Sequence, residues 1–326
     1  MKKTLKVLLI FSIIILTCGI MYLSYLSVVD MNENNNETDV KGKDISKEEY
    51  IYKEDLLELG YTVNDIKIIE TKISTTNVKK YLLNNKYDNL TKFVYSPYFN
   101  IENISRYENY FTKNNFSSDD TVLYVEIGLD KEFYTDITVI DNYNDEDALV
   151  NKYNKLPSNI TYDDLVTVEK PYSDNGKRKL RKVAYEHFVE MANAAKKDNI
   201  KLYVVSGYRT EKQQNSLFNN NVKRNGIEHA LIYSAKVNHS EHQLGLAIDI
   251  NSVNVKFEKT KEYTWLKENS YKYGFIERYP KNKEFITGYG YEPWHYRYLG
   301  IDIATTMYEK NITYEEYLVK YKSNSY

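Results

Sequence analysis

One short block, residues 240–249 with the sequence SEHQLGLAID, constrains this chain more than any other stretch. His242 and Asp249 stand on either side of a glycine, and residues 246–250 alternate in the manner of a strand. That alternation directs Leu246, Ile248 and Ile250 to a core and leaves Asp249 on the opposite face. The block therefore predicts a turn that leads into a strand and aims a carboxylate into a cleft.

Two further clusters complete a set of polar groups: EPWHYR at residues 292–297 and SGYRT at residues 206–210. A catalytic zinc takes three protein ligands and keeps one position open, and imidazole and carboxylate serve where thiolate is absent. We predict His242, Asp249 and His295 as the metal ligands. Glu292 is the predicted general base for the water that attacks an amide, and Pro293 must bend the chain so that Glu292 and His295 converge. Arg209 would stabilise an oxyanion or bind a terminal carboxylate.

Other polar residues near these clusters have weaker assignments. Ser240 and Gln214 are predicted substrate contacts, although Ser240 could equally cap a turn and Gln214 could be a surface residue of its helix. His239 is expected beside the ligands or facing substrate, and His229 is expected to be exposed. His187 falls on the apolar face of a helix, which favours a packed core histidine.

The pattern around the clusters mixes helices with short strands. Helices are expected over residues 177–198, over 211–223 behind the Thr210–Gln213 capping box, and over 261–273 ending at Gly274. A last helix opens at the capping box of residues 313–316. Strands are expected at 200–205, 275–276 and 294–298. This order predicts an α+β fold with a small, largely antiparallel sheet flanked by helices.

The N-terminal part has a different character. Residues 7–29 form an uncharged, mostly apolar run after Lys2, Lys3 and Lys6, so we expect residues 1–29 to be a transmembrane anchor with the rest of the chain outside the cell membrane. A lipoprotein signal modified at Cys18 is the alternative. Residues 30–48 read as a linker and residues 49–168 as an accessory, mostly helical subdomain with a strand at 121–127. Residues 169–326 would hold the zinc site.

Composition excludes several classes of protein. Lys and Arg number 44 against 46 Asp and Glu, so nothing indicates a nucleic-acid partner. The single cysteine, Cys18, lies in the apolar run, which leaves no disulfide and no Cys-ligated metal in the folded part. A cysteine nucleophile is excluded for the same reason, and the chain lacks a Gly-X-Ser-X-Gly elbow.

The three clusters together resemble the zinc D-alanyl-D-alanine carboxypeptidases of the VanY type. Members carry Ser-X-His-X-X-Gly-X-Ala-X-Asp, Glu-X-Trp-His and an upstream Ser-Gly-Tyr-Arg, which stand here at residues 240–249, 292–295 and 206–209. The resemblance covers roughly residues 177–301. It implies zinc on His242, Asp249 and His295, with Glu292 as base and Arg209 steadying the scissile carbonyl. It also implies the α+β fold shared with the zinc domain of hedgehog proteins, and the stem peptide of peptidoglycan as substrate.

The resemblance has two departures and leaves alternatives open. The loop that usually reads Ser-Ala-Arg-Pro-Gly reads Ser-Ala-Lys-Val-Asn here, at residues 234–238 with Lys236 in place of Arg, and Leu244 stands where Thr is usual. Because Lys and Arg are not equivalent at a bidentate contact, substrate preference stays open. An L,D-carboxypeptidase, a peptidoglycan endopeptidase and a non-catalytic zinc-stabilised binding module are the alternatives. Glu292 and Arg209 argue against the last, because a structural zinc needs no general base.

Overall fold

A computed structural model describes residues 46–174 and 177–322 of the chain, which divides into two compact units, residues 1–58 and 59–326. The described part of the first unit is the helix α2 (Ser46–Glu58). Every group of the predicted zinc site belongs to the second unit.

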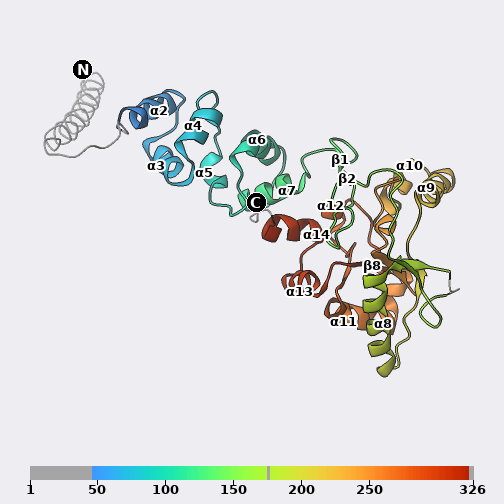
Figure 1. Ribbon diagram of the computed structural model, residues 1–326. Helices are drawn as coiled ribbons and strands as arrows, with labels where there is room; N and C mark the ends of the chain where they lie inside the picture. Colours follow the sequence, from blue (N-terminus) through green and yellow to red (C-terminus); the bar gives the residue numbers. More distant parts are fainter. Residues whose placement is uncertain (1–45, 175–176, 323–326) are drawn as a thin grey trace, which may run out of the picture. The chain divides into compact units, whose positions relative to one another are not determined.

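Residues 59–128 of the second unit are helical (Figure 1). The elements are α3 (Val63–Lys72), α4 (Thr75–Tyr81), α5 (Leu90–Phe93), the 3₁₀ turn η1 (Ile101–Asn103), α6 (Ile104–Lys113) and α7 (Ser118–Ile127). The expected short helices of this region are confirmed. The expected strand at residues 121–127 is wrong, because this segment lies in α7. The Ser117 side chain caps the start of α7 and Gly128 ends it in the left-handed conformation, so the two caps override the β-branched run between them.

Two small strand pairs follow the helices. β1 (Thr138–Val139) pairs with β2 (Asn154–Lys155) in parallel. β3 (Leu165–Thr167) pairs with β4 (Lys179–Arg181) in antiparallel fashion. These pairs connect the helical region to the sheet that carries the site.

The central sheet has four antiparallel strands in the order β5-β6-β8-β7. They are β5 (Val204–Ser206), β6 (Ala247–Ile250), β8 (His295–Tyr298) and β7 (Phe275–Glu277). The register sets Asp249 of β6 directly opposite His295 of β8. Residues opposite each other on neighbouring strands point to the same face, so the sheet itself brings two predicted ligands together.

The other face of the sheet forms the main core. Ile248 and Ile250 of β6 belong to one buried cluster with Tyr296 of β8 and with α8 (Lys182–Lys197), which lies beside β8 in Figure 1. Phe188 of α8 packs edge-on against Phe275 of β7, with ring centroids 6.4 Å apart. The predicted division of residues 246–250 into a core face and a site face is therefore confirmed.

Helices and turns surround the sheet, and the capping signals predicted some of them. They are α9 (Glu211–Asn225), α10 (Ile227–Tyr233), η2 (Glu241–Leu244), η3 (Val255–Lys259), α11 (Lys261–Asn269), η4 (Ser270–Tyr273), α12 (Glu284–Thr287), α13 (Ile301–Lys310), α14 (Tyr314–Tyr317) and the π-helical turn η5 (Leu318–Lys322). The capping boxes at Thr210 and Thr313 are present, and Gly274 ends η4 in the left-handed conformation. The predicted α+β class with a small antiparallel sheet is confirmed.

A buried cluster of charges joins the C-terminal α14 to the sheet and to η2. Arg278, which follows β7, donates to the Glu241 carboxylate at 2.7 Å and to both oxygens of Glu315 at 2.6 and 3.0 Å. Arg297 of β8 donates to the same Glu241 oxygen at 3.1 Å. The side chains of Arg278, Arg297 and Glu241 are 0% exposed, so each charge depends on its partners for stabilisation.

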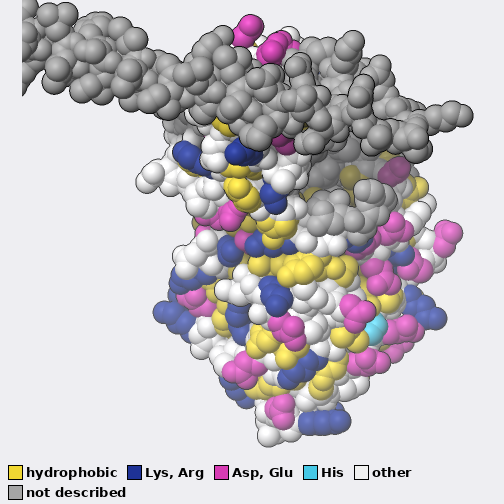
Figure 2. All heavy atoms as spheres, turned by 90° about the vertical axis from the view of Figure 1, so that its left-hand side faces the viewer, with side chains coloured by type: hydrophobic (Ala, Val, Ile, Leu, Met, Phe, Trp, Pro, Cys, Tyr) yellow, Lys and Arg dark blue, Asp and Glu magenta, His cyan; other side chains and the backbone are white. Residues whose placement is uncertain are grey.

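The surface of the described residues carries both signs of charge. In Figure 2 the Lys and Arg side chains are interspersed with Asp and Glu side chains and with small hydrophobic areas. Within the described ranges, no helix has the length and apolar character that crossing a bilayer requires. The expected anchor, residues 1–29, and the lipoprotein alternative at Cys18 lie outside the described residues.

We expect Arg278→Met to lower the free energy of unfolding by about 3–5 kcal/mol, because it leaves the buried carboxylates of Glu241 and Glu315 without their shared cation. Denaturant unfolding of metal-free protein measures this. The matched control is Arg178→Met. The Arg178 side chain is 34% exposed and forms a bidentate contact with Asp174, which the substitution removes. The control should change the free energy of unfolding by at most about 1 kcal/mol. Equal shifts for the two variants would refute the argument.

Candidate active site

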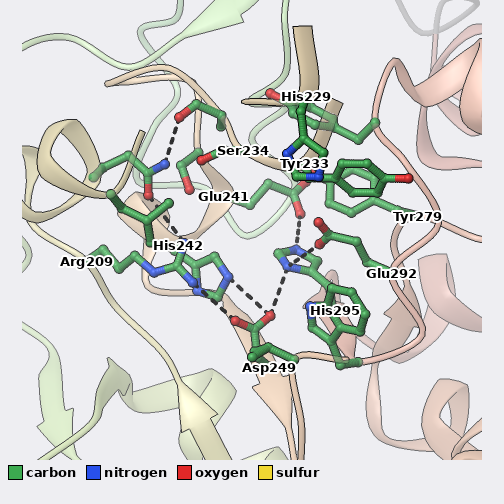
Figure 3. Close-up of a pocket in the computed structure, with 17 residues that line it drawn as sticks. Arg209, His229, Tyr233, Ser234, Glu241, His242, Asp249, Tyr279, Glu292 and His295 are labelled. Atoms are coloured by element: carbon green, nitrogen blue, oxygen red, sulfur yellow. Dashed lines mark hydrogen bonds and ion pairs between the residues drawn. The ribbon is translucent and has the colours of Figure 1, made fainter. Parts of the chain in front are cut away.

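A pocket of 430 Å³ opens over the end of β6 and the start of β8 (Figure 3). That volume falls within the range of small-molecule and substrate sites. The predicted ligands, His242, Asp249 and His295, line it together with Glu292 and Arg209. Five groups that are spread over residues 209–295 of the sequence thus meet in one cavity.

Asp249 stands at the centre of the predicted ligands. Its Oδ1 atom lies 3.4 Å from Nε2 of His242 and 3.3 Å from Nδ1 of His295. These contacts lack hydrogen-bond geometry, and Oδ1 is buried without a hydrogen-bond partner among the described residues. One ligand atom from each residue lies within 4.8 Å of the others. A buried oxygen without a partner, facing two ring nitrogens, is the arrangement that a cation would complete.

The other nitrogen of each imidazole is held by the protein. Nδ1–H of His242 donates to the Gly207 carbonyl at 2.8 Å, and Nε2–H of His295 donates to Glu241 Oε2 at 3.3 Å. These bonds turn Nε2 of His242 and Nδ1 of His295 toward the common centre, where each nitrogen offers a lone pair when its ring is neutral. The donor set of two imidazoles and one carboxylate suits a catalytic zinc.

The two rings differ in their affinity for a proton. Burial lowers the pKa of His242 to about 4, so that this ring is neutral. Burial also disfavours charge on His295, but Asp249 and Glu241 raise its pKa to about 9 in the metal-free site. A metal therefore has to displace a proton from His295, and its affinity falls as the pH is lowered.

Two glycines allow η2 to sit where His242 reaches the site. Gly245 ends η2 with φ +72°, a conformation that favours glycine, and a Cβ there would lie 2.9 Å from Cγ of Arg181. At Gly207, between β5 and α9, a Cβ would lie 2.5 Å from the carbonyl oxygen of Lys179. Close packing at both positions brings the Gly207 carbonyl within reach of His242.

Glu292 approaches the ligands from a turn that precedes β8. The turn is closed by the backbone N–H of His295, which donates to the Glu292 carbonyl at 3.2 Å, so the bend predicted around Pro293 is present. Oε2 of Glu292 lies 3.8 Å from Nδ1 of His295, and its carboxylate points into the pocket in Figure 3. Burial raises the pKa of Glu292 to about 7. A carboxyl group with that pKa can accept and return a proton near neutral pH.

Arg209 contacts the ligand carboxylate and the helix that follows it, α9. Its Nη2 donates to Asp249 Oδ2 at 3.1 Å and to Ser206 Oγ at 2.7 Å, and its Nη1 donates to Gln214 Oε1 at 3.3 Å. Of the five N–H groups of a guanidinium, Nε–H and one Nη1–H have no partner among the described residues. Arg209 therefore fixes Asp249 and still has donors for a substrate oxygen.

The two predicted substrate contacts line the pocket in different ways. Gln214 is 1% exposed, which rules out an ordinary surface residue, and its Nε2 donates to the Ala235 carbonyl at 2.8 Å. Its amide thus joins Arg209 to the loop that follows α10. Ser240 is buried and lines the pocket. Direct contact of either residue with substrate stays a prediction.

The other histidines have structural surroundings. His239 is buried outside the pocket lining, and its Nδ1 contacts the Asn151 carbonyl at 2.8 Å, so the expectation that it faces substrate is wrong. His229 is exposed, as expected, yet it lines the pocket with Tyr233 because both lie on α10. No helix was predicted at residues 227–233. His187 stacks on Tyr298 with ring centroids 5.0 Å apart, in agreement with a packed histidine.

Sequence reasoning missed the role of Glu241. Burial alone would raise the pKa of Glu241, but Arg278 and Arg297 hold it well below its usual range. The residue is therefore an anion that orients the imidazole of His295. Its place between Ser240 and His242 was visible in the sequence, but the two arginines that stabilise it were not.

The two departures from the family pattern lie away from the pocket lining. Lys236 places its ammonium 4.1 Å from the centre of the Tyr134 ring. Leu244 is fully buried in the main core. Lys236 and Leu244 are both absent from the lining of the pocket that holds the predicted ligands.

Comparisons with known proteins agree with this geometry. The family model VanY, D-alanyl-D-alanine carboxypeptidase, matches residues 177–301. YodJ of Bacillus subtilis (strain 168) is 42% identical over 212 residues, which are 60% of this chain and 78% of the relative. A D-alanyl-D-alanine carboxypeptidase of Enterococcus faecalis (strain ATCC 700802 / V583) is 40% identical over 179 residues, covering 52% of this chain and 64% of the relative. The solved structure of the LdcB LD-carboxypeptidase is 39% identical, with a TM-score of 0.54, and covers 59% of this chain and 94% of that one.

We expect wild-type protein to retain stoichiometric zinc after dialysis and Asp249→Asn to lose it, because the amide nitrogen or neutral oxygen is a poorer ligand at the centre of the set. Metal analysis by mass spectrometry measures the content. Glu292→Gln is the matched control, since Glu292 lies outside the triad, and it should keep its zinc. Lowering the pH should weaken zinc binding by wild type, because a proton competes for His295, whose pKa in the metal-free site is about 9. Full zinc content in Asp249→Asn would contradict the ligand assignment.

Proposed function

The chain belongs to the VanY family of D-alanyl-D-alanine carboxypeptidases, and we propose that it removes the C-terminal D-alanine from peptidoglycan stem peptides in a zinc-dependent reaction. The observation that carries this proposal is the convergence of His242, His295 and the partnerless Oδ1 of Asp249 beside Glu292. A structural zinc site would have four protein ligands and no neighbouring base, which disfavours the alternative of a binding module.

We assign the following roles to the site residues. His242, Asp249 and His295 would hold the zinc, which when bound supplies a Lewis acid and lowers the pKa of a water molecule. Glu292 would take the proton of the attacking water and pass it to the leaving amine, because its carboxylate is buried beside His295 and its pKa is raised to about 7. Both steps need the same carboxyl group to alternate between its two protonation states.

Arg209 would have two tasks in the reaction. It holds Asp249 through Oδ2, which leaves Oδ1 for the metal. Arg209 also lines the pocket, and its N–H groups without a partner would bind a peptide carbonyl or a terminal carboxylate. Gln214 would keep the guanidinium in place, and Ser240 would donate a hydrogen bond to the substrate. These roles rest on position and on free donors.

An L,D-carboxypeptidase is the second candidate, because the structurally similar LdcB is an LD-carboxypeptidase. The two activities cleave the same kind of bond before a terminal D-alanine and differ in the configuration of the preceding residue. The arrangement of the five site groups does not distinguish the two substrates.

The placement of the domain belongs to the proposal as well. We propose that residues 1–29 anchor the protein in the cell membrane and that residues 30–48 form a linker. An accessory subdomain over residues 49–168 and a peptidase domain over residues 169–326 would then lie outside the membrane. The uncharged run at residues 7–29, preceded by three lysines, supports this arrangement, and an extracytoplasmic site would meet its wall substrate directly.

We expect residues 31–326 to release D-alanine from a stem pentapeptide and to lose this activity when a chelator removes the metal. Penicillin-type acylating inhibitors should not inhibit the reaction, since no serine nucleophile takes part. Mass spectrometry of defined pentapeptide and tetrapeptide after incubation identifies the product. Cleavage of the tetrapeptide alone would establish the L,D activity instead. Absence of cleavage by zinc-loaded protein on both peptides would overturn the proposal.

We expect Glu292→Gln to lower kcat by about 10²–10⁴-fold with zinc retained, because the amide cannot accept the proton. In wild type, kcat/KM should fall as the pH is lowered through about 7 or somewhat below, since the raised pKa of Glu292 leaves its carboxyl protonated on the acid side. A neighbouring divalent charge moves the midpoint down and never up. Full turnover by zinc-loaded Glu292→Gln would exclude this residue as the base.

A further inference from the structure

The pocket has a second wall, opposite the metal ligands, which comes from two separate segments. α10 contributes Tyr233, and the turn after α12 contributes Tyr289. A backbone hydrogen bond joins the two segments: the Gly290 N–H donates to the Ile232 carbonyl at 3.0 Å. The Tyr233 ring packs so closely on Gly290 that a Cβ at this glycine would lie 2.4 Å from Cε1 of the ring.

Behind this wall lies a buried lysine that the proposed chemistry does not use. Lys152 is 4% exposed, and its ammonium donates to the Leu231 carbonyl of α10 at 2.8 Å. Leu231 is in the last turn of α10, where carbonyl groups have no partner within the helix and the helix dipole favours a cation. Lys152 thus caps the C-terminus of the helix that carries Tyr233.

Aromatic rings surround the same ammonium. It lies 4.6 Å from the ring centre of Phe133, 4.8 Å from that of Tyr289 and 5.7 Å from that of Tyr134. Among the described residues, no carboxylate forms an ion pair with Lys152. The positive charge is therefore stabilised by ring faces and one carbonyl, and such contacts are strong when they are shielded from water.

Phe133, Tyr134 and Lys152 are held together on one side of the wall. The Tyr134 hydroxyl lies 3.5 Å from the Tyr289 hydroxyl, and its ring meets His239 edge-on with centroids 5.0 Å apart. His239 in turn contacts the carbonyl of Asn151, next to Lys152. Phe133, Tyr134 and Lys152 precede position 177, where the match to the family model begins. The chain outside the family match therefore supports one side of the pocket.

We propose that Lys152 is a positioning residue for substrate binding, which fixes Tyr233 of α10 and Tyr289 against each other so that the wall facing the metal ligands keeps its shape. The ammonium contacts both segments, through the Leu231 carbonyl on one side and the Tyr289 ring on the other. The inference rests on the proposed function, because it concerns the same pocket. It assigns to residues 133–152 a role in holding peptide and none in the bond-breaking step.

The test is steady-state kinetics of Lys152→Met in the full chain with a stem pentapeptide. Methionine keeps the length of the side chain and removes the charge and the hydrogen bond. We expect KM to rise about tenfold while kcat stays within about twofold and zinc content is unchanged, the pattern of lost binding without lost transition-state contacts. Lys131→Met, an exposed lysine of the same segment, is the matched control and should leave KM unchanged.

The outcomes separate this inference from the proposed function. Turnover by wild type with an unchanged KM in Lys152→Met would overturn the role of Lys152 and leave the carboxypeptidase assignment intact. A parallel loss of kcat and zinc would also overturn it, because the lysine would then support the metal site. Should Lys152→Met fail to fold, Phe133→Leu removes one face of the aromatic surround and keeps the lysine. That variant should raise KM by a smaller factor at constant kcat, and a wild-type KM would reject the proposal.

Discussion

The antiparallel register between β6 and β8 is the constraint on which the site depends. It places Asp249 opposite His295 on one face of the sheet and sends Ile248 and Tyr296 into the core on the other. A shift by one residue would exchange the two faces, burying the ligands in the core and exposing apolar side chains. The hydrophobic core therefore fixes the position of the polar ligands, and stability and chemistry are coupled through one pair of strands.

Buried charges then orient what the register has brought together. Glu241 is an anion because Arg278 and Arg297 contact it, and it holds the imidazole of His295. Arg209 takes one oxygen of Asp249 and leaves the other without a partner. The site is thus arranged before a metal arrives, since the protein holds the outer nitrogen of each imidazole and one oxygen of Asp249 and leaves Oδ1 of Asp249 facing the common centre. Such prior arrangement reduces the reorganisation that binding and catalysis require.

Local signals in the sequence predicted much of the fold and of the site. The capping boxes at Thr210 and Thr313 and the glycine at 274 marked helix ends correctly, because capping involves residues only a few positions apart. The same locality explains the error at residues 121–127, where β-branched residues favoured a strand while Ser117 and Gly128 enclosed a helix. α10 was missed, and with it the place of His229 and Tyr233 in the pocket, since a seven-residue helix leaves little periodic signal.

The sequence by itself determined the types of group available: two imidazoles, an aspartate, a glutamate and an arginine in an order that matches the VanY family. It also determined the alternation that separates the ligand face of β6 from its core face. Only the tertiary structure decided which groups orient the ligands, because Arg278 contacts Glu241 and Glu315, which lie 37 residues before and 37 residues after it in the chain. The same holds for Lys152, whose partners lie at residues 133–134, 231 and 289. Contacts between segments so distant in the chain are fixed by packing, and no local pattern encodes them.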